Sequence, residues 1–330
     1  MKEILEHLYQ HKKLSKEESR DILIKIASGA YNDYQIASFL TAFIMRNISL
    51  EELRGFQEAL RELALPIDLS AYDPMDLCGT GGDGKNTFNI STLTSFVAAG
   101  AGIPIAKHGN YGVSSVSGSS NVLEALGVTF QSEESKLREQ LEKAGICFLH
   151  APLFHPAMKQ VGPVRKQLGV KTFFNMLGPL VNPAKPTKQM TGVFNLELAR
   201  MYQYLFQEED MQFTVVHAID GFDEITLTGN CKVITNNHEQ IVSAATFGVE
   251  PVTPEAILGG DTVEEAAAIF MRIINGNGTE AQNNVVLANA AMAIQTYHQE
   301  LSLDDCLEKA SDSLKGKRAL KALNTLKQLS

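Results

Sequence analysis

The sequence has 330 residues, of which 44% are hydrophobic, so it can bury a large core and is predicted to form two domains. Its 29 Lys and Arg against 38 Asp and Glu give a net charge of −9, which argues against nonspecific binding to nucleic acids or anionic membranes. We find no apolar run of about 18 residues and no hydrophobic signal segment, and we expect a cytoplasmic protein. The cysteines are far apart and form no Cys-x-x-Cys pair, which predicts reduced thiols and no zinc site.

The first 66 residues show apolar residues at helical spacing, which predicts a small four-helix domain. Pro66 is expected to stop the last helix. No catalytic cluster stands out here, so we expect this part to serve packing or an oligomer interface. Three capping boxes predict helix starts, at Ser15 with Glu18, Asn32 with Gln35, and Ser49 with Glu52.

From Asp73 onward, short apolar runs alternate with helical stretches. This alternation predicts an α/β domain with a central, mostly parallel sheet covered by helices on both faces. Ligands of such sheets bind beyond the carboxyl ends of the strands. The expected helices include 93–100, 122–126, 133–144 and 281–298, and the expected strands are 75–78, 103–106, 128–130, 146–150, 213–217, 224–227 and 233–235.

A glycine-rich loop follows the first expected strand. Residues 76–92 read DLCGTGGDGKNTFNIST and lead from the strand into the next helix. Glycines permit positive φ and let backbone N–H groups approach a ligand, while the helix N-terminus adds positive partial charge. The pattern predicts a phosphate-binding loop, although a tight turn without a ligand has similar residues. It is neither a P-loop nor a dinucleotide fingerprint, and Asp83 beside a bound anion suggests a magnesium ion between them.

Polar residues also follow the second expected strand. Lys107 offers a positive charge for phosphate, and Asn110 offers both a donor and an acceptor. His108 is equally well explained as an ordinary loop histidine without a role in binding. Serines at 114–115 and the stretch 117–121 (SGSSN) precede the next helix. This second helix start indicates either another anion site or simple N-capping.

Two further candidates lie later in the chain. Arg165 follows Pro163 and precedes the apolar, proline-bent loop 173–183. Guanidinium pairs bidentately with carboxylate, so Arg165 suits a ligand that is part aromatic and part carboxylate, although the residues alone favour a surface arginine. Asp223 and Glu224 begin an expected strand, where both can converge on magnesium, although an exposed acidic pair is the commoner fate of such residues.

Together these motifs resemble the anthranilate phosphoribosyltransferase family over essentially the whole chain. The resemblance implies a nucleoside phosphorylase/phosphoribosyltransferase-like fold and a homodimer paired through the small helical domain. Two departures are Asn121, where the family often has Asp, and Tyr111, where it often has Arg. The implied domains are 1–66 joined by helices from about 165–190, and 73–164 with 191–330. The motifs are GTGGD at 79–83, NIST at 89–92, KHGN at 107–110, SGS at 117–119, VR at 164–165, NxxGP at 175–179 and DE at 223–224.

The resemblance implies transfer of the phosphoribosyl group of 5-phosphoribosyl-1-pyrophosphate to the amine of anthranilate, with release of pyrophosphate, in tryptophan biosynthesis. It implies magnesium as the cofactor, with two ions expected. No general base is named, because the anthranilate amine is already a nucleophile; Lys107 is expected to stabilise charge. The implied metal ligands are Ser91, Asp223 and Glu224; the anthranilate ligands are Gly79, Asn110 and Arg165; the donor ligands are Gly79, Gly82, Asp83, Thr87, Asn89, Ile90, Ser91, Thr92, Lys107, Ser115 and Ser119.

Two alternatives remain open from the sequence. A pyrimidine nucleoside phosphorylase-like enzyme also uses a glycine- and serine-rich phosphate loop, but paired acids for magnesium and an arginine for a carboxylate argue against it. A non-catalytic, nucleic-acid-binding relative needs a basic groove, which the net charge of −9 opposes. We therefore expect small-molecule substrates, with neither a nucleic acid nor a membrane as partner.

Overall fold

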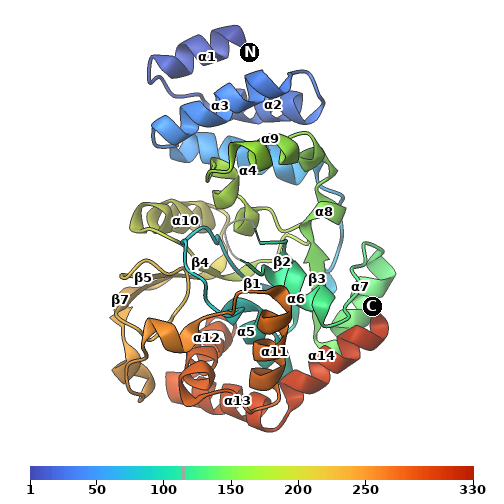
Figure 1. Cartoon of the computed structure of the whole chain (residues 1–330), viewed down its shortest axis with the longest axis vertical. Coiled ribbons are helices and arrows are strands. Elements are labelled where there is room, and N and C mark those ends of the chain that lie inside the picture. Colours follow the sequence, from blue (N-terminus) through green and yellow to red (C-terminus); the bar gives the residue numbers. More distant parts are fainter. Residues whose placement is uncertain (113–115) are drawn as a thin grey trace. The chain divides into compact units, whose positions relative to one another are not determined.

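The computed structural model describes residues 1–112 and 116–330, so the expected donor contact at Ser115 lies outside the described residues. The chain forms two compact units, one helical and one α/β, which Figure 1 colours along the sequence. The helical unit contains residues 1–66 and 151–183, and the α/β unit contains residues 67–150 and 184–330.

The helical unit begins with four helices, as the sequence predicts. All three expected capping boxes are present, because each cap side chain accepts from the backbone N–H three residues on and the third residue bonds back. The last of these helices ends at Leu63, shortly before Pro66. The helices of this unit are α1 (Lys2–Tyr9), α2 (Lys16–Ala27), α3 (Asp33–Met45), α4 (Leu50–Leu63), α8 (Ala151–Phe154) and α9 (Gly162–Leu168).

An aromatic cluster joins the two chain segments of the helical unit. Phe39, Phe43 and Phe56 come from the first segment, and Phe173 comes from the second. The Phe173 ring stacks on Phe56 with 4.3 Å between centroids and lies 5.2 Å from Phe43. The second segment therefore belongs to this unit, and its bounds are 151–183 rather than the expected 165–190, because strand β3 (Ile146–His150) ends immediately before it.

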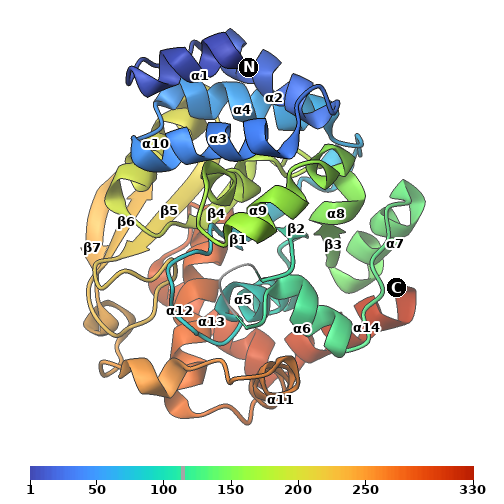
Figure 2. The same ribbon diagram turned by 45° about the horizontal axis from the view of Figure 1, so that its top comes forward.

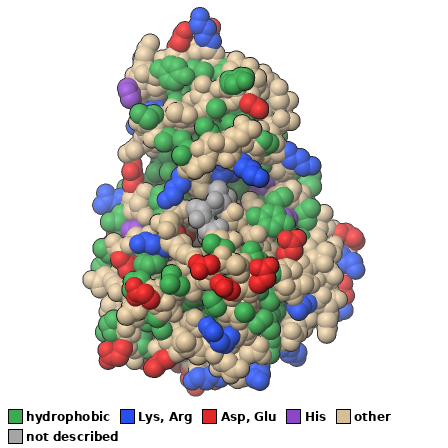
Figure 3. Space-filling view, in the orientation of Figure 1, with side chains coloured by type: hydrophobic (Ala, Val, Ile, Leu, Met, Phe, Trp, Pro, Cys, Tyr) green, Lys and Arg blue, Asp and Glu red, His purple; other side chains and the backbone are tan. Residues whose placement is uncertain are grey.

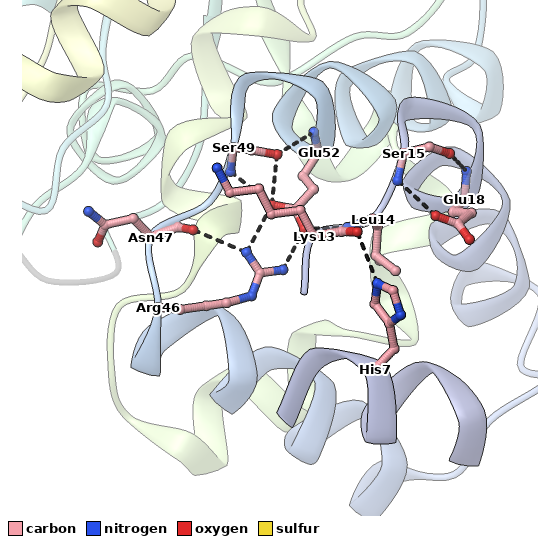
Figure 4. A network of polar contacts seen from close by, with 9 residues as sticks. All are labelled: His7, Lys13, Leu14, Ser15, Glu18, Arg46, Asn47, Ser49 and Glu52. Carbon is pink, nitrogen blue, oxygen red and sulfur yellow. Dashed lines mark hydrogen bonds and ion pairs between the residues drawn. The ribbon is translucent and has the colours of Figure 1, made fainter. Parts of the chain in front are cut away.

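A buried ion pair holds the turn between α3 and α4. Glu52 is fully buried and receives two hydrogen bonds from the Arg46 guanidinium, whose side chain is 8% exposed (Figure 4). The same carboxylate accepts from the backbone N–H groups of Leu14, at 2.9 Å, and Ser49, at 2.8 Å. Burial alone raises the pKa of Glu52, but the bonds from Arg46 and these N–H groups outweigh it and lower the pKa.

The α/β unit is built on a seven-stranded sheet in the order β3-β2-β1-β4-β5-β6-β7. Strands β1 to β5 run parallel, and β6 and β7 are antiparallel additions at one edge. The sheet is therefore mostly parallel, as predicted. The strands are β1 (Met75–Gly79), β2 (Ile105–Gly109), β3, β4 (Lys188–Gly192), β5 (Gln212–Ala218), β6 (Cys231–Thr235) and β7 (Glu239–Val242).

Helices cover both faces of this sheet. Helices α5 and α12 pack on one face and α10 lies on the other, as the two views in Figures 1 and 2 agree. Among the described residues, no helix is long and apolar enough to cross a membrane. The helices of this unit are α5 (Ile90–Gly100), α6 (Ser119–Ala125), α7 (Glu134–Ala144), α10 (Leu196–Glu208), α11 (Val263–Ile274), α12 (Glu280–Tyr297), α13 (Leu303–Lys315) and α14 (Arg318–Leu329).

The sheet differs from the sequence expectation at four places. Strand β4 was not expected because its sequence, KQMTG, is polar, yet its buried Gln189 donates to Thr191 inside the unit at 2.7 Å. Strand β7 was not expected because its side chains are mostly exposed at the sheet edge. Residues 128–130 form a connection between helices rather than a strand. Residues 224–227 are not a strand: both backbone groups of Ile225 bond the Asn289 side chain rather than a neighbouring strand, and Leu227 has a φ of 60°.

The buried ion pair generates a stability prediction. We expect Glu52→Gln to lower the free energy of unfolding by about 3–5 kcal/mol, because the Arg46 charge stays buried without its carboxylate. Denaturant unfolding of the full chain, followed by circular dichroism, measures this. Because the folded-state pKa of Glu52 is lowered, its contribution should also fade as pH falls through that pKa.

The matched control is Glu62→Gln, since Glu62 pairs with Arg20 at the surface and its side chain is 51% exposed. That change should cost less than about 1 kcal/mol. Equal effects of the two substitutions would contradict a special role for the buried pair.

Candidate active site

The glycine loop lies between the carboxyl end of β1 and the N-terminus of α5. It begins at Gly79, and the Thr80 N–H donates to the carbonyl of Gly192 at 2.9 Å, which continues the pairing of β1 with β4. Gly81, Gly82 and Gly84 have φ values of 60°, 75° and 75°, so the loop uses backbone conformations that other residues rarely adopt. The predicted order of strand, glycine loop and helix start is therefore present.

Asp223 and Glu224 meet this loop from a segment more than 130 residues later in the chain. The Asp223 carboxylate accepts from the N–H of Gly81 at 2.7 Å. The Glu224 carboxylate accepts from the N–H of Ser91, in the first turn of α5, at 3.3 Å. The structure thus brings all three residues of the expected metal set to one place, although Asp223 and Glu224 lie in a loop and not at the start of a strand.

The two acids sit in an environment that disfavours their charges. Burial and then the nearby Asp83 raise the pKa of Asp223 to about 7. Burial and then Asp223 raise the pKa of Glu224 well above its ordinary value, while Lys107 acts in the opposite direction. Like charges held close together in a low-dielectric site stabilise each other's protonated form, and a bound cation relieves that repulsion.

The donor set at this place fits magnesium. Carboxylate and hydroxyl oxygens are ligands that this ion accepts, and it binds through one or two carboxylates together with phosphate oxygens. Among residues 1–112 and 116–330, no group of three or more His, Cys, Asp or Glu residues gathers into an all-protein metal cluster. Two acids and the Ser91 hydroxyl would therefore hold the ion with help from a phosphorylated ligand.

Two glycines that are partners in the β1–β4 ladder make room for Asp223. Gly79 pairs with Gly192, and Asp223 packs directly against both glycines. A Cβ on Gly79 would lie 2.4 Å from the Asp223 carboxylate, and a Cβ on Gly192 would lie 1.5 Å from its carbonyl oxygen. Both distances are impossible for real atoms, so the acid can reach the loop only because neither position has a side chain. Gly192 lies in a polar stretch with no neighbouring motif that marks it in the sequence.

Lys107 occupies a different position from the one expected. It lies within β2 rather than after the strand, its side chain is 2% exposed, and its ammonium donates to the backbone carbonyl of Leu77. Burial lowers its pKa, whereas the negative charge of neighbouring Asp76 and Glu224 raises it. The buried ammonium therefore acts on Glu224 from within the protein.

The segment after β2 caps the next helix. The Asn110 carbonyl accepts from the Ser120 N–H at 3.1 Å and from the Ser119 hydroxyl at 3.3 Å. The Asn121 side chain accepts from the N–H groups of Gly112, at 2.9 Å, and Gly118, at 3.0 Å. Asn110 and Ser119 thus lie together, and Asn121 performs a capping task that an aspartate oxygen would perform equally well.

The remaining predicted donor ligands lie around the loop and the start of α5. Asp83 accepts from the Lys85 N–H at 3.0 Å, and Thr87 forms an isolated antiparallel bridge with Leu258. The Asn89 side chain donates to the carbonyl of Ser117 at 3.0 Å. Ile90 and Thr92 are 1% exposed, so a ligand would meet them through backbone N–H groups.

Arg165 belongs to the helical unit. It lies in α9, its guanidinium is 5.2 Å from the Phe174 ring centroid, and it donates to the Asn175 side chain at 3.4 Å. Burial lowers its pKa. Asn175 also accepts from the Thr172 N–H at 3.1 Å, so the bent loop and the arginine are held together.

The two units match two family models. Residues 2–64 match the model described as "Glycosyl transferase family, helical bundle domain", and residues 71–320 match "Glycosyl transferase family, a/b domain". A helical bundle, a mostly parallel α/β unit and a glycine loop facing paired acids define a glycosyltransferase that transfers a pentosyl group.

The relatives identify the particular family. Anthranilate phosphoribosyltransferase of Flavobacterium johnsoniae is 59% identical over 330 residues, which is 100% of each chain, and that of Bacteroides thetaiotaomicron is 53% identical over 329 residues, covering 100% of this chain and 99% of its own. The chain belongs to the anthranilate phosphoribosyltransferase family.

Solved structures of this family are also similar in fold. The enzyme of Thermus thermophilus superposes with a TM-score of 0.90 and 32% identity, covering 98% of each chain. The Saccharomyces cerevisiae enzyme in complex with PRPP and Mg superposes with a TM-score of 0.90 and 27% identity, covering 98% of this chain and 96% of that one.

The close approach at Gly192 generates a prediction. We expect Gly192→Ala to lower transferase turnover by roughly 100-fold, because the new Cβ must push the Asp223 backbone away from the loop and a misplacement of about 1 Å has an effect of that size. Steady-state rates on wild type and variant, with circular dichroism to monitor folding, measure it. Gly162→Ala is the control, because a Cβ there meets nothing within 4 Å. Equal turnover in all three proteins would refute the argument.

Proposed function

We propose that this protein transfers the phosphoribosyl group of 5-phosphoribosyl-1-pyrophosphate to the amine of anthranilate and releases pyrophosphate, as a step of tryptophan biosynthesis. The observation that carries the proposal is the meeting of Asp223 and Glu224 with Gly81 and Ser91 at the loop between β1 and α5. An anion-binding loop and a cation-binding acid pair in one place suit a substrate with a pyrophosphate leaving group.

The donor is assigned to the glycine loop and the two helix starts that follow it. Backbone N–H groups of the loop and of the first turn of α5 supply hydrogen bonds to phosphate oxygens, and the helix adds positive partial charge. Asn110 and Ser119, which are joined by a hydrogen bond, supply further polar groups for the donor. The proposed donor ligands are Gly79, Gly82, Asp83, Thr87, Asn89, Ile90, Ser91, Thr92, Lys107 and Ser119, together with Ser115.

Magnesium is assigned to Ser91, Asp223 and Glu224, and we propose that two ions take part in the reaction. The yeast relative whose structure contains PRPP and Mg supports use of this metal. When bound, magnesium supplies positive charge to the pyrophosphate leaving group. Asp223 and Glu224 would hold the ion as carboxylates, and because their pKa values are raised, protons compete with the metal at this site.

The chemistry needs positioning and charge stabilisation more than a base. Breaking the bond between C1 of the ribose and the leaving oxygen develops positive charge on the sugar and negative charge on pyrophosphate. The Lys107 ammonium contributes positive charge near Glu224, which favours the deprotonated state of that acid. The anthranilate amine attacks as a neutral nucleophile, so its alignment with C1 is the main task of the binding residues.

The acceptor is assigned to Gly79, Asn110 and Arg165. A planar guanidinium fork suits the carboxylate of anthranilate, and the Phe174 ring beside Arg165 lowers the hydration of that cation. Yeast relatives with 4-fluoroanthranilate support an aromatic carboxylate as the acceptor in this family.

The assembly and location of the protein follow the family. We propose a homodimer paired through the N-terminal helices, in a cytoplasmic protein whose partners are small molecules. Helix α3 presents Tyr34 and Met45 with exposed fractions of 85% and 75%, which suits burial against a second copy. In the face of the α/β unit seen in Figure 3, acidic and basic side chains are intermixed and form no basic stripe suited to a nucleic acid.

The test of the proposed function is the loss of anthranilate fluorescence when the purified protein meets both substrates. We expect the loss to require 5-phosphoribosyl-1-pyrophosphate and magnesium, and to stop when a chelator is added. Magnesium-independent, phosphate-dependent cleavage of thymidine or uridine would instead identify a nucleoside phosphorylase.

The acid pair generates a prediction for this reaction. The double change Asp223→Asn with Glu224→Gln should abolish magnesium-dependent turnover while circular dichroism and the melting temperature stay near wild type. The reason is the loss of charge stabilisation worth several kcal/mol in the transition state. Near-normal turnover of the double variant at limiting magnesium would show that these acids do not hold the ion.

Arg165 generates a separate prediction. Arg165→Ala should raise the Michaelis constant for anthranilate by roughly 10- to 150-fold, which corresponds to about 1.5–3 kcal/mol for one charge-assisted hydrogen bond. The constant for the phosphoribosyl donor should change far less, and Arg165→Lys should rescue only in part because an ammonium cannot make the planar two-bond contact. Steady-state kinetics with each substrate varied in turn measures both. A rise confined to the donor constant would assign Arg165 to the phosphate site.

A further inference from the structure

Asn289 is a buried polar residue in the middle of α12, on a helix that is otherwise rich in alanine and valine. It is 1% exposed, and no part of the proposed reaction uses it. Buried amides are costly unless their donors and acceptors are paired, so its hydrogen bonds identify its task.

The Asn289 side chain binds both backbone groups of a single residue, Ile225. Its amide nitrogen donates to the Ile225 carbonyl at 2.8 Å, and its oxygen accepts from the Ile225 N–H at 3.2 Å. The same nitrogen donates to the carbonyl of Val285, one turn earlier in the helix, at 2.8 Å. The side chain is thus anchored to its own helix and reproduces, at Ile225, the pair of bonds that a neighbouring strand would make.

Ile225 directly follows Glu224, and no strand pairs with this segment in the part of the chain that the structure describes. Two residues later, Leu227 has a φ of 60°, so the extended backbone does not continue. Asn289 therefore replaces the hydrogen bonds of a neighbouring strand. It fixes the position and orientation of the backbone that carries the two acids.

The same helix also fixes the other side of the proposed metal set. Helix α12 packs against α5, whose first turn contains Ser91. A small cavity of about 10 Å³ is lined by Ser91, Glu224 and Asn289, among others, so the three lie around one space. Helix α12 therefore contacts both sides of the proposed metal set. It packs against the helix that contains Ser91, and it bonds the backbone of the residue that follows Glu224.

We infer that Asn289 is a positioning residue for the magnesium ligands, which it sets through the Ile225 backbone without touching the ion. The inference rests on the proposed function. Residues that orient metal ligands typically affect metal affinity by roughly 10- to 100-fold when they are changed. We expect Asn289→Leu, which keeps a similar volume and removes the two bonds to Ile225 and the one to Val285, to raise the half-saturating magnesium concentration by that factor.

The experiment compares Asn289→Leu with a matched change in the same helix. Thr296→Val removes a buried hydroxyl of α12 that bonds Thr214 of β5 at 2.6 Å and the Met292 carbonyl at 2.7 Å, away from the acid loop. For wild type and both variants we would measure Mn²⁺ binding by calorimetry in the presence of 5-phosphoribosyl-1-pyrophosphate, the magnesium dependence of turnover, the Michaelis constant for anthranilate and the melting temperature.

The expected result is a roughly 10- to 100-fold weaker metal affinity in Asn289→Leu, an unchanged anthranilate constant, and wild-type metal affinity in Thr296→Val even where its melting temperature falls equally. Unchanged Mn²⁺ binding in Asn289→Leu, or an equal loss in Thr296→Val, would overturn the inference. If Asn289→Leu does not fold, Asn289→Ser makes the same comparison with a smaller polar side chain. Wild-type protein without magnesium-dependent turnover would overturn the proposed function instead.

Discussion

The candidate site depends on one close approach, that of the Asp223 backbone and carboxylate to Gly79 and Gly192. These glycines are register partners in adjacent parallel strands, and neither position leaves room for a methyl group. The approach lets a loop from the far end of the chain reach the N–H of Gly81, and it places two acids beside a helix N-terminus. The proposed sites for phosphate and metal therefore both depend on one packing constraint within the sheet, and burial together with neighbouring carboxylates raises the pKa values of the two acids.

The two units differ in whether their buried ionisable side chains are paired with an opposite charge. In the helical unit, the Arg46 and Glu52 charges compensate each other, and five hydrogen bonds to the Glu52 carboxylate hold a turn. In the α/β unit, the carboxyl groups of Asp223 and Glu224 are neighbours, and the Lys107 ammonium opposes the raised pKa of Glu224. A buried pair of opposite charges holds its own part of the fold together. Two buried carboxyl groups without a matching cation are instead typical of a functional site.

Much of this arrangement was predictable from local patterns. The three capping boxes and most of the strands of apolar sequence depend on neighbouring residues, and the sequence indicates them; residues 128–130 and 224–227 are the apolar stretches that it wrongly predicts as strands. Strand β4 is not indicated by the sequence because its buried Gln189 is polar; the side chain bonds Thr191 of its own strand and the Cys78 sulfur of β1. The loop at Asp223 resembles a strand in sequence, but its backbone at Ile225 is held by a side chain of α12 instead of a neighbouring strand. Gly192 and Asn289 carry no local signature. Gly192 lies against the carbonyl of Asp223, 31 positions later in the chain. Asn289 bonds the backbone of Ile225, 64 positions earlier. The roles assigned to the donor and acceptor ligands remain predictions.

The division of the helical unit into two chain segments has a consequence for synthesis on the ribosome. Phe39, Phe43 and Phe56 are made early, but Phe173, which stacks on Phe56, belongs to a segment that follows three strands of the sheet. At about 5–20 residues per second, that ring is added roughly 5–20 seconds after α4 is complete. During this interval Phe43 and Phe56 lack the Phe173 ring that contacts them in the folded unit, so the aromatic cluster is completed only after much of the sheet has been synthesised.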